Sequence, residues 1–95
     1  MRAFVKDPIK IETIVKGFAN YRRIQIIYLI SYEKGLSVNN IADRLNIGFR
    51  SVSQHLDKMY KGGLVSRRHR GVEVIYETTS RGREVTEFIK ALESN

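Results

Sequence analysis

Arginine, glutamine, serine and lysine recur between residues 49 and 61, and their side chains suit paired hydrogen bonds to flat polar edges and ion pairs with phosphates. An arginine can bond a guanine through two parallel N–H groups, and a glutamine can bond an adenine in the same way. Phe49 can pack on a thymine methyl group or, alternatively, close the preceding turn as a partly buried residue. The residues expected at base edges are Phe49, Arg50, Ser51, Ser53 and Gln54. Those expected at phosphates are Lys58, Lys61 and Arg44.

The apolar residues among them repeat at helical spacing. Val52, Leu56 and Met59 fall on one face, which predicts a helix over residues 49–61 with its polar side chains outward. A second, shorter apolar period predicts a helix over residues 37–45. Two short helices joined by a tight turn form the arrangement that places its second helix in a DNA major groove.

Signals at the ends of the first motif helix agree with this interpretation. Ser37 stands just ahead of the apolar period as a candidate N-cap. Asn46-Ile47-Gly48 then interrupts the period, because asparagine tolerates a left-handed backbone and glycine adopts almost any conformation. We therefore expect a three-residue turn between the two helices.

A basic β-hairpin is predicted directly after the second helix. Gly62-Gly63 ends the helix, and two β-prone runs follow at residues 64–69 and 72–77, with Arg70-Gly71 as the turn. Because a strand alternates its faces, only some of the basic residues can point toward one partner, and the residue at the tip is the safest candidate. The hairpin residues expected to contact the DNA backbone or minor groove are Arg67, Arg68, His69 and Arg70.

This stretch resembles the winged helix-turn-helix of ArsR-type transcriptional repressors over roughly residues 20 to 78. The residues that carry the resemblance are Ser37-Val38, Ile41-Ala42, Leu45-Asn46-Ile47, Ser51-Val52-Ser53-Gln54-His55-Leu56 and Gly63-Leu64-Val65. The resemblance implies DNA binding and favours dimer contact through the flanking helices. Many proteins of this type release DNA on binding a metal, through cysteines in the first motif helix or acidic and histidine ligands in the last helix.

Charge and composition support a nucleic-acid partner. The chain has 95 residues and a net charge of +7, and residues 49–71 alone carry six Lys and Arg against Asp57. A basic face that coincides with a helix-turn-helix pattern is typical of a polyanion-binding surface. The hydrophobic content of 42% suits a globular core, and the length predicts a single domain over residues 1–95.

Three more helices are expected outside the motif. One begins at Pro8, capped by Asp7, and runs to about Asn20. Its apolar stripe is either intramolecular packing or a dimer surface. The last helix, capped by Thr79 or Ser80, carries a similar stripe. The residues expected in a dimer interface are Ile11, Ile14, Val15, Phe18, Val85, Phe88, Ile89 and Leu92.

The helix expected over residues 20–33 has a wide apolar face, with a stop at Gly35. Its expected buried residues are Ile24, Ile27, Tyr28 and either Leu29 or Ile30. Arg22 and Arg23 near its start oppose the helix dipole, so they either contact a phosphate or acid or form a plain surface pair.

Several classes of protein lack their signatures here. No catalytic triad, paired carboxylate pattern or glycine-rich phosphate loop is present, so an enzyme is not expected. The chain has no cysteine, its last helix has no histidine, and His55 and His69 are expected at the surface or at DNA, so no metal or other cofactor is expected. The apolar run at residues 24–30 is too short to span a bilayer, and no signal sequence is recognised. A cytoplasmic location follows as an expectation.

The predicted fold class is mainly α with a small β-hairpin wing (α+β), a winged helix-turn-helix in the order α-α-α-α-β-β-α. The predicted function is sequence-specific binding of double-stranded DNA as a transcriptional regulator, a repressor, by a homodimer that reads a pseudo-palindromic operator through helix 49–61 and wing 64–77. The alternative is a winged-helix module that docks other proteins, for which a polar, basic reading helix would be unnecessary.

Overall fold

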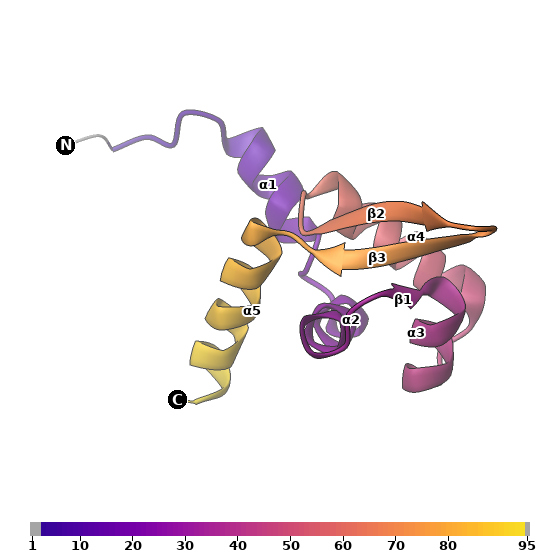
Figure 1. Ribbon diagram of the computed structural model, residues 1–95. Helices are drawn as coiled ribbons and strands as arrows, with labels where there is room; N and C mark the ends of the chain where they lie inside the picture. Colours follow the sequence, from indigo (N-terminus) through magenta and orange to yellow (C-terminus); the bar gives the residue numbers. More distant parts are fainter. Residues whose placement is uncertain (1–2, 95) are drawn as a thin grey trace.

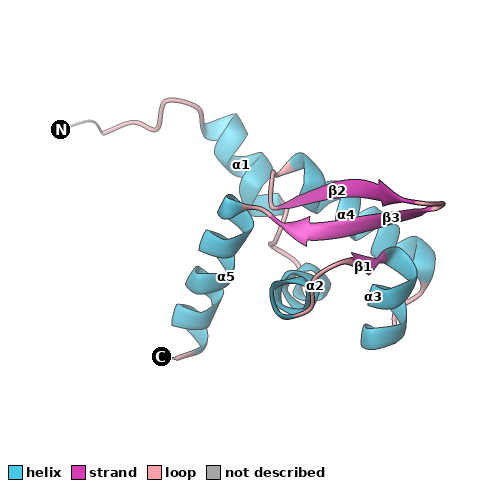
Figure 2. Ribbon diagram, viewed as in Figure 1, coloured by secondary structure: helices cyan, strands magenta, loops and turns pink. Residues whose placement is uncertain are grey.

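The computed structural model describes residues 3–94 and arranges them as five helices and three strands (Figures 1 and 2). The elements in chain order are α1 (Pro8–Lys16), α2 (Tyr21–Tyr32), β1 (Leu36–Ser37), α3 (Val38–Leu45), α4 (Phe49–Lys61), β2 (Val65–Arg70), β3 (Glu73–Thr78) and α5 (Ser80–Glu93). The fold is a winged helix-turn-helix, which confirms the predicted class. Figure 1 shows α1 and α5 at one end of the molecule and the tip of the β2–β3 hairpin at the other.

Short polar side chains cap α1, α3 and α5 at predicted positions. Asp7 caps α1 by accepting from the Lys10 amide, and Pro8 occupies the first turn, where a missing N–H costs nothing. Ser37 and Asn40 form a reciprocal capping box at α3, with both bonds at 3.1 Å. Thr79 caps α5 by accepting from the Gly82 amide.

The turn of the helix-turn-helix depends on one left-handed residue. Asn46 ends α3 with φ 54° and ψ 49°, a conformation that asparagine tolerates better than most residues. It is the one non-glycine residue with positive φ among residues 3–94. This conformation reverses the chain quickly enough for α4 to begin three residues later, as the sequence predicts.

The sheet has one strand more than predicted. Leu36 and Ser37 form β1, which pairs antiparallel with β3, so the strand order is β1-β3-β2. The hairpin lies one residue further along the chain than expected: β2 runs to Arg70, β3 starts at Glu73, and the turn is Gly71-Val72. Gly71, with φ 63°, supplies the positive φ that the turn needs.

The core lies between α2, α3, α4 and the sheet. It is made mainly of aliphatic residues with one methionine and Tyr76. Its members with no exposed surface are Ile26, Ile27, Ile41, Val52, Leu56, Met59, Leu64 and Ile75. The predicted face of α4 is confirmed, because Val52, Leu56 and Met59 have no exposed surface.

The prediction for α2 was wrong in part. Ile27 and Ile30 are buried as expected, but Ile24 is exposed, Tyr28 is only half-buried, and Ile26 is in the core. Because α2 is apolar around most of its circumference, periodicity alone could not select the inner face. Two helix ends also differ: α1 stops at Lys16 rather than near Asn20, and α2 stops at Tyr32, with Gly35 three residues further on.

The start of α5 is bound closely to the segment between α4 and the wing. Thr79 donates through its hydroxyl to the Gly63 carbonyl at 2.6 Å and through its amide to the Leu64 carbonyl at 3.1 Å. Gly82 packs so closely there that a Cβ atom would overlap the Leu64 carbonyl oxygen. We call this segment, Gly62–Leu64 with Thr79–Gly82, the wing root.

Candidate nucleic-acid interface

The outer face of α4 presents polar side chains that are free of partners. Arg50, Gln54, Lys58 and Lys61 are exposed, and none of the four side chains makes a hydrogen bond or ion pair with another residue in the range 3–94. Since the opposite face of the helix is fully buried, these groups project outward from a rigid support. Ser51 and Ser53 flank them and are half-buried.

Phe49 lies at the start of α4 beside the wing. Its side chain is 55% exposed, so it does not close the turn as a buried residue. It lines a shallow depression of about 270 Å³ together with residues of the wing tip, among them Val72 and Val74. The first turn of α4 and the tip of the wing therefore form one continuous surface.

The wing divides its basic residues between two faces. The register pairs Arg67 with Tyr76 and His69 with Val74, so these four side chains share the face toward α4. On this face the Arg67 guanidinium lies over the Tyr60 ring and near Asp57. Arg67 is therefore held against α4.

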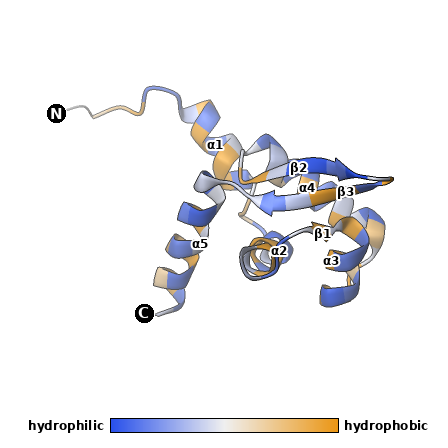
Figure 3. Ribbon diagram, in the orientation of Figure 1, coloured by the Kyte–Doolittle hydropathy of each residue, from blue (hydrophilic) through white to orange (hydrophobic). Residues whose placement is uncertain are grey.

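The other wing face carries Arg68 and Arg70. Arg68 forms an ion pair with Glu77 through Nε at 3.1 Å. Arg70 at the strand end has no ion pair or hydrogen-bonding side-chain partner within residues 3–94. Figure 3 shows β2 as a hydrophilic strand along most of its length. Of the four predicted wing residues, Arg70 and His69 are unpaired in the described part of the chain.

Arg44, expected at a phosphate, has a partner inside the molecule. Its guanidinium approaches both carboxylate oxygens of Glu33, at 3.2 Å from Nε to each and 3.1 Å from Nη2 to Oε2. The pair links α3 to the end of α2. A phosphate contact at Arg44 would have to compete with this carboxylate.

The His55 side chain contacts α2. Its Nδ1 accepts a hydrogen bond from Arg23 Nε at 3.2 Å, and the imidazole is half-buried. Burial lowers the pKa of His55, and the neighbouring charges of Arg23 and then Arg22 lower it further. Sequence reasoning missed the contacts of Arg23 and Tyr60, because each joins residues far apart in the chain and neither position carries a local signal.

The residues predicted for a dimer interface fall into two groups. Ile14, Phe18, Val85 and Ile89 pack against the core of the same chain. The exposed group consists of Ile11, Val15, Phe88 and Leu92, at 42–58% exposure. Both helices thus keep an apolar strip at the surface, on the end of the molecule away from the wing tip (Figure 1).

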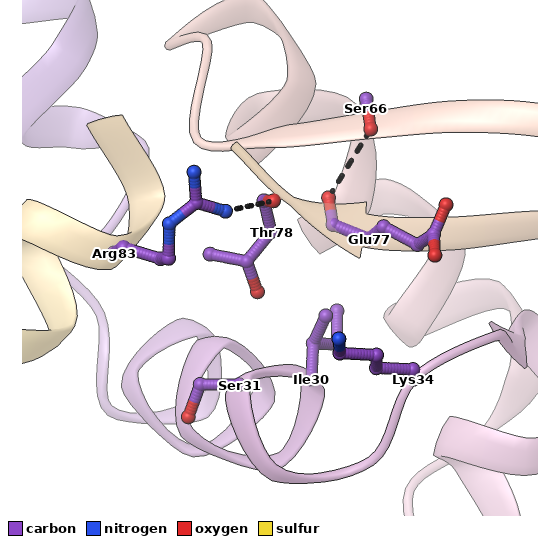
Figure 4. Close-up of a pocket in the computed structure, with 7 residues that line it drawn as sticks. All are labelled: Ile30, Ser31, Lys34, Ser66, Glu77, Thr78 and Arg83. Carbon is purple, nitrogen blue, oxygen red and sulfur yellow. Dashed lines mark hydrogen bonds between the residues drawn. The ribbon is translucent and has the colours of Figure 1, made fainter. Parts of the chain in front are cut away.

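A polar cavity of about 530 Å³ lies at the base of the wing, between α2, the two long strands and the start of α5 (Figure 4). Arg83 spans one side and donates to the Thr78 carbonyl at 3.2 Å, while Lys34 runs back along α2 toward Ile30. The Thr78 hydroxyl is buried and has no hydrogen-bond partner among the residues that the structure describes. No cluster of three or more potential metal-ligating side chains occurs within residues 3–94.

Comparison with known proteins identifies the family. Residues 20–67 match the model of the arsR family of bacterial regulatory proteins. The transcriptional activator HlyU of Vibrio cholerae is 33% identical over 75 residues, which cover 79% of this chain and 68% of HlyU. A solved structure of HlyU from Vibrio cholerae superposes with a TM-score of 0.81 at 28% identity, over 97% of this chain and all of the other.

Two further structures share the fold. The transcriptional repressor PagR of Bacillus anthracis is 29% identical, with a TM-score of 0.73 over 90% of this chain and 95% of the other. The homodimeric winged helix-turn-helix domain Mb0332 of Mycobacterium bovis is 21% identical, with a TM-score of 0.81 over 99% and 91%. No helix of residues 3–94 has the length and hydropathy to cross a membrane. The family match over residues 20–67 and the 33% identity with HlyU show that the chain belongs to the arsR family of bacterial regulatory proteins. It is a DNA-binding transcriptional regulator rather than an enzyme.

Proposed function

We propose that the chain binds a specific operator sequence in double-stranded DNA, with α4 in the major groove and the wing on the flanking backbone or minor groove. The observation that carries this proposal is the outer face of α4, where Arg50, Gln54, Lys58 and Lys61 are exposed and have no partner within residues 3–94. Side chains that are ordered at their base by a buried helix face and free at their tips are suited to intermolecular hydrogen bonds.

The proposed roles follow position along α4. Arg50 and Gln54, with Phe49, Ser51 and Ser53, belong to the first half of the helix and are proposed to contact base edges. Lys58 and Lys61 lie further along and are proposed to contact phosphates, which fix register but carry no sequence information. In the wing, Arg70 and His69 are proposed to contact DNA directly. Arg67 and Arg68 are proposed as secondary contacts, because each already pairs with a carboxylate of the same chain.

We further propose that residues 1–95 act as one domain in a two-fold dimer joined through α1 and α5. Two sets of exposed apolar residues support this, Ile11 and Val15 on α1 and Phe88 and Leu92 on α5, since a partner would bury them. A single α4 contacts only a few base pairs, so two copies on a pseudo-palindromic site would provide useful affinity. The homodimeric state of Mb0332 agrees with this proposal.

Selection of bound duplexes from a random pool tests the proposal directly. We expect enrichment of two inverted half-sites spaced by about one helical turn or a multiple of it. Arg50→Ala should then cost roughly 1–3 kcal/mol of binding free energy and relax the preference at one base pair, whereas Lys61→Ala should weaken all duplexes alike. Lys10→Ala, which removes an exposed cation of α1, is the control and should change neither.

Failure to enrich any duplex would contradict specific DNA reading and favour the protein-docking alternative. The predicted repression is tested separately with a reporter gene behind the selected operator. Expression should fall when the chain is present and recover with Arg50→Ala. A rise in expression would make the protein an activator, as HlyU of Vibrio cholerae is.

A further inference from the structure

A single arginine side chain connects three helices of the domain. Arg23, near the start of α2, donates from Nη1 to the carbonyl of Lys16, the last residue of α1. The same guanidinium donates from Nε to His55 Nδ1 in the middle of α4, at 3.2 Å. The last carbonyls of a helix have no partner inside the helix, so Arg23 satisfies one of those of α1.

The backbone that carries Arg23 is itself fixed. Asn20 caps α2 by accepting from the Arg22 amide at 2.9 Å and from the Arg23 amide at 3.3 Å. The cap at the α1–α2 corner, the turn between the two helices, therefore fixes the backbone of Arg23. Its guanidinium then links this turn to α4 through His55. The next residue along α4, Leu56, is fully buried, so the contact meets the helix close to its packed face.

The contact defines the chemical state of the imidazole. A guanidinium N–H can only donate, so Nδ1 of His55 must carry a lone pair and the ring proton of the neutral form must lie on Nε2. Burial, Arg23 and Arg22 all lower the pKa of His55, in that order. The two charged side chains that act on the imidazole, Arg23 and Arg22, both belong to α2. On α4 itself, Lys58 lies about one turn further along the helix. From α1, the Lys16 carbonyl accepts a hydrogen bond from Arg23.

We propose that Arg23 is a positioning residue for DNA binding, which fixes α4 against the α1–α2 corner and does so only while His55 is uncharged. The inference rests on the proposed function of α4. It adds that the presentation of the reading helix depends on a side chain outside the helix-turn-helix. Protonation of His55 would remove the acceptor and place two cations against each other, so the link would open on acidification.

The first test is a double-mutant cycle on operator affinity, with Arg23→Gln, His55→Phe, which keeps a ring but has no acceptor, and the pair of changes together. We expect Arg23→Gln to weaken binding about three- to tenfold, as loss of one partly solvated hydrogen bond would. The double variant should be little weaker than either single variant. Arg22→Gln is the matched control: Arg22 is the neighbouring half-buried arginine, and its side chain bonds Gln25 of the same helix rather than α4.

The second test measures how the effect of Arg23→Gln on operator affinity depends on pH. If Arg23 had a purely structural role, this effect would not change with pH. The folded-state pKa of His55 is depressed, so the link is present above that pKa and is lost as the pH falls through it. The ratio of wild-type to Arg23→Gln affinity should therefore fall toward one as the pH is lowered through this depressed pKa, which lies below the ordinary histidine value of about 6.5. In NMR titrations of the free protein, the pKa of His55 should rise in Arg23→Gln.

The outcomes separate this inference from the proposed function. Absence of any preferred duplex for the wild-type chain would refute specific DNA reading, whereas the NMR titration would still report the link. Normal operator affinity in Arg23→Gln, equal losses in Arg22→Gln and Arg23→Gln, or a ratio constant with pH would overturn the positioning role. Thermal unfolding of each variant identifies any that fails to fold. If Arg23→Gln does not fold, Arg23→Lys replaces it in the cycle, because lysine keeps the charge but lacks the planar guanidinium that bonds Lys16 and His55 at once.

Discussion

The guanidinium of Arg67 lies over the ring of Tyr60, 3.8 Å from its centroid, and its Nη1 is 3.8 Å from Asp57 Oδ1. These contacts join the first half of β2 to the last turns of α4. A cation over an exposed aromatic ring contributes about 0.5–1 kcal/mol, and the exposed ion pair adds less. The wing is thus held against α4 on one face, while Arg70 on the other face has no side-chain partner within residues 3–94.

Removing the free arginine should affect DNA binding without affecting the fold. We expect Arg70→Ala to reduce the slope of log affinity against log salt by about 0.9, as loss of one phosphate contact does, with no change in the melting temperature. Arg68→Ala is the matched control on the same strand face, because its guanidinium already pairs with Glu77. An equal change of slope in both variants would show that the Glu77 pair does not hold Arg68 back from DNA.

The ion pair between Arg44 and Glu33 assigns Arg44 a role inside the molecule. Arg44→Gln should lower the free energy of unfolding by no more than about 1 kcal/mol, because both side chains are partly solvated. Its effect on operator affinity should be smaller than that of Lys58→Ala. Chemical denaturation and binding titrations check the two expectations. A loss of affinity as large as that of Lys58→Ala would restore Arg44 as a phosphate contact.

Two threonines in contrasting surroundings allow a stability test with one isosteric change. The Thr78 hydroxyl is buried and has no hydrogen-bond partner within residues 3–94, whereas the Thr86 hydroxyl donates to the Gly82 carbonyl at 2.8 Å. Thr78→Val should raise the free energy of unfolding by about 1 kcal/mol, because a methyl group replaces an unsatisfied hydroxyl. Thr86→Val should lower it by a similar amount. Urea unfolding at neutral pH compares them, and destabilisation by Thr78→Val would mean that its hydroxyl is satisfied in solution.

The proposed dimer is tested by placing a charge in the exposed apolar strip. Phe88→Asp should give monomers by sedimentation and weaken operator binding by at least tenfold, because a carboxylate would be buried between the copies. Phe49→Asp is the matched control for association, since Phe49 has nearly the same exposure, 55% against 53%, at the far end of the molecule. Ile14 suits this test less well, because it packs against the core and its substitution would also damage the fold. A Phe88→Asp protein with unchanged mass would refute the α5 interface.

Local signals were sufficient where a structure is decided by neighbouring residues. The caps at Asp7, Ser37 and Thr79, the left-handed Asn46 and the buried stripe of α4 could all be predicted, since each depends on residues within a few positions. The two-residue strand β1 could not, because Leu36 and Ser37 are too few to show a period and their partners lie on β3.

The candidate site shows the same division. Which face of α4 points outward followed from its apolar period, and exposure of Arg50 and Gln54 agrees with it. The sequence did not indicate which basic residues already have partners inside the molecule. Glu33 binds Arg44, and Tyr60 holds Arg67, through contacts that depend on how separate elements are placed in space.

The close packing of Gly82 on the Leu64 carbonyl has a mechanical consequence. With Thr79 bonded to Gly63 and Leu64, the wing root leaves α5 little freedom to pivot independently of the strands. In two copies joined along α5, these backbone contacts would fix the distance between the two wings. The side chains of the interface would not set that distance. Changes at the strip would then alter how firmly two copies hold together, while a larger residue at position 82 would alter the gap between half-sites that they can span.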